Sequence, residues 1–276
     1  MNELPLVFSS QGRDLVGIAH QSANTSHNGQ GVLLIVGGPQ TRVGSHRQFV
    51  LLARFLASHG IPVFRFDYTG MGDSEGEQSD FYQALPDVDA AIKAFRIHCP
   101  KVENIALWGL CDAASVALSY VSLEQKYINR LILLNPWVRQ EQSKAQAILK
   151  YYYLRKLSSK NFWLGLLAGK LNIKKSAIDF INSLKKALVS KPKSNKSQFS
   201  TSIQHEKFLL NESNYIEIMR CGLERFKGDI HFILSGEDLT AREFESLISK
   251  DPIWKKLITD KSTSYITIAN ANHTFS

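Results

Sequence analysis

Short apolar runs alternate with amphipathic stretches along most of the chain. Several runs are apolar throughout, as strands buried on both faces of a sheet are, and the stretches between them carry apolar residues at helical spacing. We expect strands at residues 31–38, 62–68, 104–110, 130–136, 229–238 and 264–270, and helices at 45–59, 84–98, 113–126 and 212–225. This alternation predicts βαβ units and a mostly parallel sheet covered by helices.

Two segments depart from this rhythm. Residues 4–10 and 15–20 flank a Gln-Gly-Arg-Asp turn and predict a hairpin, which would add antiparallel strands at one edge of the sheet. Residues 137–210 are helical in pattern, rich in Tyr and Lys, and end in a loop-like Ser, Lys and Pro sequence. We interpret the chain as one domain over residues 1–276, with 137–210 inserted as a cap over the carboxyl ends of the strands.

The positive charge is concentrated in that insertion. The chain carries a formal net charge of +8, yet residues 137–207 hold fifteen Lys and Arg against three acidic residues, and the remainder holds 18 against 22. The predicted cap therefore has three interpretations: a peripheral contact with an anionic membrane, attraction of an anionic substrate such as an acyl-CoA or a charged glycan, or a solvated cover. No recognised nucleic-acid motif accompanies the charge, which argues against nucleic acid as a partner.

The cysteines and the N-terminus indicate a reducing compartment. The three cysteines are scattered without CxxC spacing, which argues against a disulfide framework and against a zinc site. The first residues lack the pattern of a signal peptide, and no apolar run approaches the ~20 residues needed to span a bilayer. We expect a cytoplasmic protein without metal or cofactor, at the inner membrane if the cap docks there.

A cysteine stands at the tip of a strand-to-helix turn, in the sequence Gly109-Leu110-Cys111-Asp112-Ala113. Such a turn needs small residues two positions away on each side, because larger side chains would collide with the strand and helix backbones. Gly109 and Ala113 meet that need. The following helix N-terminus favours a thiolate and a nearby oxyanion, so Cys111 is the candidate nucleophile; a buried structural cysteine is the alternative.

The partners of a cysteine nucleophile follow the fifth and sixth predicted strands. Asp238 ends the sequence Gly-Glu-Asp after one strand, and His273 follows the other. Carboxyl ends of parallel strands are where sites form in open α/β sheets. The order nucleophile, acid, histidine is typical of α/β-hydrolases, and this predicts the α/β-hydrolase fold. Glu237 is the alternative acid, because the acid loop is one residue shorter than the common Gly-x-x-Asp.

The loop after the first predicted central strand supplies candidate oxyanion donors. The Asp112 N–H is one donor, and the second is the N–H of Gly38 or Gln40, because Pro39 between them has none. The same loop continues through three basic residues that would bind an anionic substrate group: Arg42, His46 and Arg47. The alternative is ordinary surface charge beside a helix capped by Ser45.

Two stretches resemble a known family. Residues 36–76 and the Trp-Gly-Leu-Cys-Asp-Ala-Ala-Ser motif are similar to the exosortase A system-associated hydrolase 1 family, within the serine aminopeptidase-like group of α/β-hydrolases. The resemblance implies a cysteine in place of the usual serine, as at Cys111, and a link to exopolysaccharide synthesis and PEP-CTERM protein sorting. It implies no particular substrate. A helix that normally follows the histidine has only three residues here, so we expect it to be missing.

These residues favour acyl transfer. A thiolate leaves readily from a tetrahedral intermediate, so a cysteine suits thioesters and activated esters better than amides. We expect hydrolysis of a small acyl ester or thioester through Cys111, His273 and Asp238. The alternatives are transfer of the acyl group to a glycan or amine, and a non-enzymatic scaffold that binds a partner or the membrane through its cap.

Overall fold

The computed structural model describes residues 2–21, 28–78, 80–139, 210–260 and 263–275. The chain divides into two compact units, the first made of Met1–Val138 with Ile203–Ser276 and the second of Arg139–Ser202. The predicted cap at 137–210 lies almost wholly outside the described residues, so its structure and position stay a prediction. The first unit is described below.

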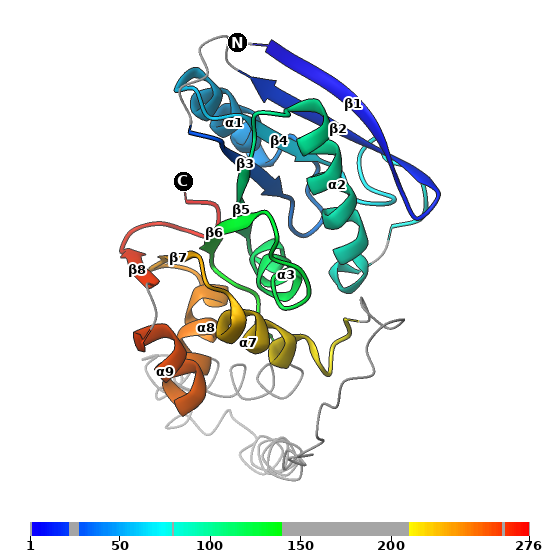
Figure 1. Cartoon of the computed structure of the whole chain (residues 1–276). Helices are drawn as coiled ribbons and strands as arrows, with labels where there is room; N and C mark the ends of the chain where they lie inside the picture. Colours follow the sequence, from blue (N-terminus) through cyan, green and yellow to red (C-terminus); the bar gives the residue numbers. More distant parts are fainter. Residues whose placement is uncertain (1, 22–27, 79, 140–209, 261–262, 276) are drawn as a thin grey trace, which may run out of the picture. The chain divides into compact units, whose positions relative to one another are not determined.

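An eight-stranded sheet runs through the first unit in the order β1-β2-β4-β3-β5-β6-β7-β8 (Figure 1). Strands β1 and β2 form an antiparallel hairpin, and β2 pairs antiparallel with β4, whereas all the remaining pairs are parallel. The strands are β1 Asn2–Ser10, β2 Arg13–Gln21, β3 Gln30–Ile35, β4 Val63–Phe66, β5 Asn104–Leu110, β6 Ile128–Leu134, β7 Asp229–Ser235 and β8 Thr263–Ile268.

Side chains alternate between two cores along the central strands. Leu33 and Ile35 of β3 join the larger core, whereas Val32 and Leu34 of the same strand join the smaller one. This is the alternation that a strand covered on both faces requires. Helix α1 (Gln48–Ser58) covers the smaller core. The larger core is closed by α2 (Leu85–His98), α3 (Asp112–Tyr120), α7 (Tyr215–Arg225), α8 (Leu239–Lys250) and α9 (Pro252–Asp260).

The mostly parallel sheet covered by helices and the hairpin at the sheet edge are confirmed. Several predicted bounds were wrong. The helix predicted from 113 to 126 ends at Tyr120, and the one predicted from 45 begins at Gln48, because His46 and Arg47 have positive φ of 49° and 63°. Helices α8 and α9 had not been predicted. Ser45 belongs to a short 3₁₀ turn and its side chain caps no helix, which corrects the capping alternative.

None of the helices among the described residues combines the length and apolar content needed to cross a membrane. In the same residues, no group of three or more His, Cys, Asp or Glu is arranged to hold a metal ion.

Candidate active site

Cys111 sits in a strained backbone conformation between β5 and α3. Its φ is 64° and its ψ is −126°, in a region that residues with a Cβ rarely adopt. The surrounding backbone holds it there. Cys111 N–H donates to the Leu134 carbonyl at 2.9 Å, and the Cys111 carbonyl accepts Trp137 N–H at 3.2 Å and Ala114 N–H at 3.1 Å. The chain therefore turns from strand to helix within one residue, with the thiol at the apex.

Gly109 permits this turn. A Cβ at Gly109 would lie 2.6 Å from the Ala113 carbonyl carbon and oxygen and 2.7 Å from the Ala114 nitrogen. Those distances are shorter than van der Waals contact, and the atoms are backbone, so they cannot rotate away. The requirement for a small residue at this position follows directly from the close approach of β5 to α3.

His273 and Asp238 are held together beyond the ends of β8 and β7. The Nδ1 of His273 lies 3.0 Å from Oδ2 of Asp238, and the same oxygen accepts the Ala241 N–H at 3.1 Å as the N-cap of α8. Gly236 lets the two loops approach, because a Cβ there would lie 2.2 Å from the Ala269 carbonyl oxygen. Asp238 is 8% exposed.

Each member of this pair shifts the pKa of the other. The hydrogen bond with Asp238 raises the pKa of His273 above 6.5, more than burial lowers it. Burial opposes ionisation of Asp238, yet the hydrogen bonds from His273 and from backbone N–H groups lower its pKa below 3.8. The pair is therefore an imidazole that binds a proton readily beside a carboxylate that stays ionised.

Glu237 takes no part in this pair. Its N–H donates to the Ala271 carbonyl at 3.1 Å, and its side chain is exposed. Of the two acids left open by the sequence, the structure brings Asp238 to the histidine.

Cys111 and His273 line one cavity of about 210 Å³. Its other walls are Gly37, Gly38, Pro39, Gln40, Phe49 and Leu110. Phe49 is buried and supplies an apolar wall, so the cavity offers a thiol and an imidazole at the edge of a largely apolar space. This combination suits an acyl chain with a reactive carbonyl.

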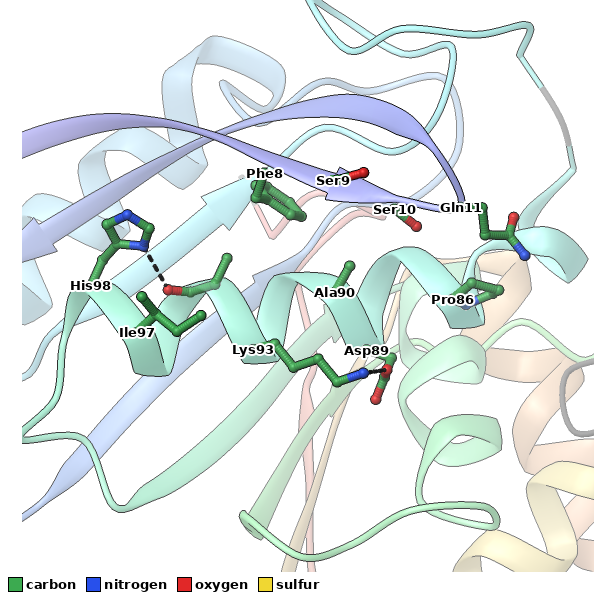
Figure 2. Close-up of a pocket in the computed structure, with 11 residues that line it drawn as sticks. Phe8, Ser9, Ser10, Gln11, Pro86, Asp89, Ala90, Lys93, Ile97 and His98 are labelled. Carbon is green, nitrogen blue, oxygen red and sulfur yellow. Dashed lines mark hydrogen bonds and ion pairs between the residues drawn. The ribbon is translucent and has the colours of Figure 1, made fainter.

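A larger cavity of about 430 Å³ lies elsewhere, between β1 and α2 (Figure 2). Its ionisable lining groups are already engaged: Lys93 pairs with Asp89 at 2.6 Å, and His98 Nδ1 bonds the Ala94 carbonyl at 2.9 Å. No cysteine is among its lining residues. The larger cavity therefore lacks a thiol nucleophile among its lining residues, and the smaller cavity beside Cys111 is the candidate active site.

The predicted oxyanion donors lie beside Cys111, but they are engaged. Gly38 N–H donates to both carboxylate oxygens of Asp112, at 2.7 and 2.9 Å. Gln40 N–H makes a long 3.4 Å bond to the Gly37 carbonyl. Burial raises the pKa of Asp112, while the N–H groups of Gly38 and Ala113 act in the opposite direction.

The three basic residues proposed to bind an anionic substrate do not gather at this cavity. The Arg42 guanidinium pairs with Asp67 and Asp73, and its backbone N–H also donates to Asp67. His46 and Arg47 are exposed, and neither lines the cavity beside Cys111. Arg42 is therefore a structural residue of the loop, because its charge neutralises a fully buried carboxylate.

Asn135 is a buried polar residue that was not among the predicted site residues. Its Oδ1 accepts Ser235 N–H at 2.9 Å, and its Nδ2 donates to the Ser235 hydroxyl and, at 3.4 Å, to the His273 carbonyl. It thus joins the ends of β6 and β7 to the histidine loop. A polar residue that ends an apolar strand just before a proline is the signal that points to it.

Comparisons with known proteins confirm the predicted α/β-hydrolase fold. A profile of the family described as serine aminopeptidase, S33, matches residues 28–214, which is more than half of the chain. The match includes Cys111 and ends before Asp238 and His273. No curated protein matches the chain.

Solved structures of hydrolases are similar over almost the whole chain. An esterase from Pyrococcus furiosus is 17% identical, with a TM-score of 0.60 over 99% of this chain and 83% of that one. Est1E from Butyrivibrio proteoclasticus, solved with ferulic acid bound, is 14% identical, with a TM-score of 0.58 over 98% and 92%. The α/β hydrolase GrgF from Penicillium sp. sh18 is 16% identical, with a TM-score of 0.58 over 99% and 91%.

Proposed function

Because the chain belongs to the serine aminopeptidase S33 family of α/β-hydrolases, we propose that it hydrolyses esters or thioesters with Cys111 as nucleophile. The observation that carries the proposal is the strained backbone of Cys111, at φ 64°, on a cavity shared with a histidine that is bonded to a buried carboxylate. Nucleophile, base and orienting acid are the three parts that covalent acyl transfer requires.

Acylation begins with a proton transfer from the Cys111 thiol to His273. Asp238 holds Nδ1, so Nε2 is the nitrogen that accepts the proton. The thiolate Sγ then bonds to the substrate carbonyl carbon, and an electron pair moves to the carbonyl oxygen. When the intermediate collapses, the bond to the leaving alcohol or thiol breaks, and that group takes the proton from His273.

Deacylation repeats these steps with water. His273 takes a proton from the water molecule, and the hydroxide adds to the acyl carbon. The bond between this carbon and Sγ then breaks, which releases a carboxylic acid, and the thiolate regains its proton. Asp238 stays ionised throughout and stabilises the imidazolium formed in each half.

A sulfur nucleophile sets the substrate class. An amine is a poorer leaving group than a thiolate, so an amide intermediate tends to return to substrate, whereas an ester or thioester proceeds. The cavity of about 210 Å³ is smaller than the ~300–1,000 Å³ that is common for ligand pockets. We therefore assign short acyl groups to it.

The biological setting is proposed from the sequence alone. Residues 36–76 and the motif around Cys111 resemble the exosortase A system-associated hydrolases, which supports a role beside exopolysaccharide synthesis. A glycan ester is the substrate we propose, because it is an ester that occurs where polysaccharides are made.

Hydrolysis of p-nitrophenyl acetate and of an acetyl thioester tests the proposal. The wild-type protein is compared with Cys111→Ala, His273→Ala and the matched control Cys221→Ala, whose thiol lies outside the cavity. We expect the first two variants to lose at least about 10²-fold in kcat/KM and the control to keep wild-type activity. Full activity in Cys111→Ala would reject the assigned nucleophile.

A further inference from the structure

The Asp112 side chain occupies the place where the proposed reaction needs a substrate oxyanion. Its carboxylate accepts the Gly38 N–H with both oxygens and the Ala113 N–H at 2.9 Å, and it also interacts with its own N–H. The N–H after the nucleophile and an N–H from the loop after the first central strand are the donors of an oxyanion hole in this fold. A carboxylate oxygen carries the negative charge that such donors bind best.

The backbone is fitted closely around this carboxylate. A Cβ at Gly37 would lie 2.4 Å from Oδ1 of Asp112 and 2.5 Å from the Leu110 carbonyl oxygen. The loop that carries the donors therefore approaches the helix start as closely as a glycine allows. A substrate oxygen has access to these N–H groups only after the carboxylate has moved.

A second position for the carboxylate is available next to the first. Asp112 and Gly38 line a cavity of about 160 Å³ together with Tyr68, Met71 and Phe81. The Tyr68 hydroxyl oxygen is buried and has no hydrogen-bond partner among the described residues. A buried hydroxyl that lacks a partner is costly, so this donor favours any acceptor that reaches it.

Among the three acids that line this cavity, Asp112 is the one whose charge acts most strongly on the Tyr68 hydroxyl. Burial and the negative charges of Asp112 and Asp87 raise the pKa of Tyr68, which keeps the phenol protonated. The Asp87 carboxylate is already engaged by the Ser10 hydroxyl and by Thr69. Asp80, the third acid of this cavity, is exposed to solvent.

We propose that Asp112 is a positioning residue that closes the oxyanion hole at rest and rotates to the Tyr68 hydroxyl when an acyl substrate binds. The inference rests on the proposed function. It assigns two states to one side chain: bound to the Gly38 N–H without substrate, and bound to the phenol while the hole holds the oxyanion. Each acylation then includes the displacement of one carboxylate.

Acylation kinetics of four variants, each compared with the wild-type protein, test the two states. In Asp112→Ala the hole is open, so the rate constant of Cys111 acylation rises about tenfold or more. In Tyr68→Phe the second position lacks its donor, so the rate constant falls about threefold to tenfold. In the double variant no carboxylate is present to rotate, so adding Tyr68→Phe to Asp112→Ala leaves the acylation rate constant unchanged. Tyr82→Phe, a matched change outside this cavity, stays at the wild-type rate.

A binding measurement tests the hole without catalysis. Acetate titrated into the Asp112→Ala variant should shift the amide resonances of Gly38 and Ala113 and compete with substrate, and the wild-type protein should show neither effect. Asp112→Asn keeps the shape without the charge and serves if the alanine variant does not fold; its rate and acetate response should lie between the two.

The outcomes separate this inference from the proposed function. Absence of Cys111 acylation in the wild-type protein as well as in every variant, with acetate still binding only where Asp112 is replaced, rejects the proposed function and retains the closed hole. Cys111-dependent acylation that is equal or slower in Asp112→Ala and Asp112→Asn overturns the inference. If Tyr68→Phe changes the acylation rate constant equally in the wild-type protein and in Asp112→Ala, the position of the carboxylate at the Tyr68 hydroxyl is rejected.

Discussion

The Nδ1 atom of His273 lies 3.0 Å from Oδ2 of Asp238, and that oxygen also accepts the first-turn N–H of Ala241. One carboxylate thus caps α8 and orients the imidazole, so the start of a helix fixes the direction of the base. Because Asp238 is 8% exposed, water competes little for either bond.

Replacing Asp238 by Asn should lower kcat/KM for esters by about 10²-fold or more, because the imidazole loses the partner that orients it and stabilises its charged form. Glu237→Gln is the matched control: it removes a neighbouring exposed carboxylate and should leave the rate unchanged. Steady-state kinetics of the two variants decide between the acids. The reverse order of effects would assign the role to Glu237.

The pH dependence of acylation should follow His273. The base must be neutral to accept a proton, and the hydrogen bond with Asp238 raises its pKa above 6.5. The acylation rate should therefore rise with pH through a midpoint above 6.5. In Asp238→Asn burial becomes the dominant influence and lowers the pKa, so the midpoint moves to lower pH. Stopped-flow acylation between about pH 5 and 9 measures both; an unshifted midpoint in the variant contradicts this assignment.

Gly109→Ala should destabilise the protein and misplace the nucleophile together. The added Cβ would lie 2.6 Å from the Ala113 carbonyl, so strand and helix must separate, at a cost of about 1–3 kcal/mol. Urea unfolding gives the stability, and alkylation of Cys111 by iodoacetamide reports its exposure. Gly12→Ala, in the β1–β2 turn, is the control: its φ of 77° strains an alanine there, but the added Cβ meets nothing within 4 Å, so the alkylation rate should stay unchanged. Wild-type alkylation and stability in Gly109→Ala would contradict the steric account.

Arg42→Ala should lower the stability of the protein. It leaves the fully buried carboxylate of Asp67 without its cation, which costs about 3–5 kcal/mol of unfolding free energy. Arg47→Ala, an exposed residue of the same loop, should change stability by less than about 0.5 kcal/mol. Unchanged stability in Arg42→Ala, with a higher KM only for anionic esters, would restore the substrate-binding role that the sequence suggested.

The sheet followed from the sequence because strands buried on both faces are apolar throughout. The β3 run is an example, since alternate residues enter different cores and both sets must be apolar. Helices α8 and α9 were not among the predicted elements, although Phe244, Leu247 and Ile248 have helical spacing. Helix starts were harder to predict, because the residue types of His46 and Arg47 give no sign of their positive φ.

The candidate site was partly visible in the sequence. Cys111, Asp238 and His273 follow strands whose carboxyl ends meet at one edge, so chain order alone brought them together. The bond between Gly38 and Asp112 joins residues 74 positions apart and depends on one side-chain rotation. Patterns of residue type carry no information on such a rotation, and the pairing of Arg42 with Asp67 was hidden for the same reason.

Intact-protein mass spectrometry after acid quench tests the central claim most directly. The wild-type protein is mixed with acetyl thioester or p-nitrophenyl acetate, quenched within milliseconds, and compared with Cys111→Ala and Cys221→Ala. We predict one acetyl increment on the wild-type and Cys221→Ala proteins, mapped by peptide digestion to Cys111, and none on Cys111→Ala. Continued hydrolysis by Cys111→Ala, or an increment mapped to another residue, would contradict a cysteine nucleophile at the turn between β5 and α3.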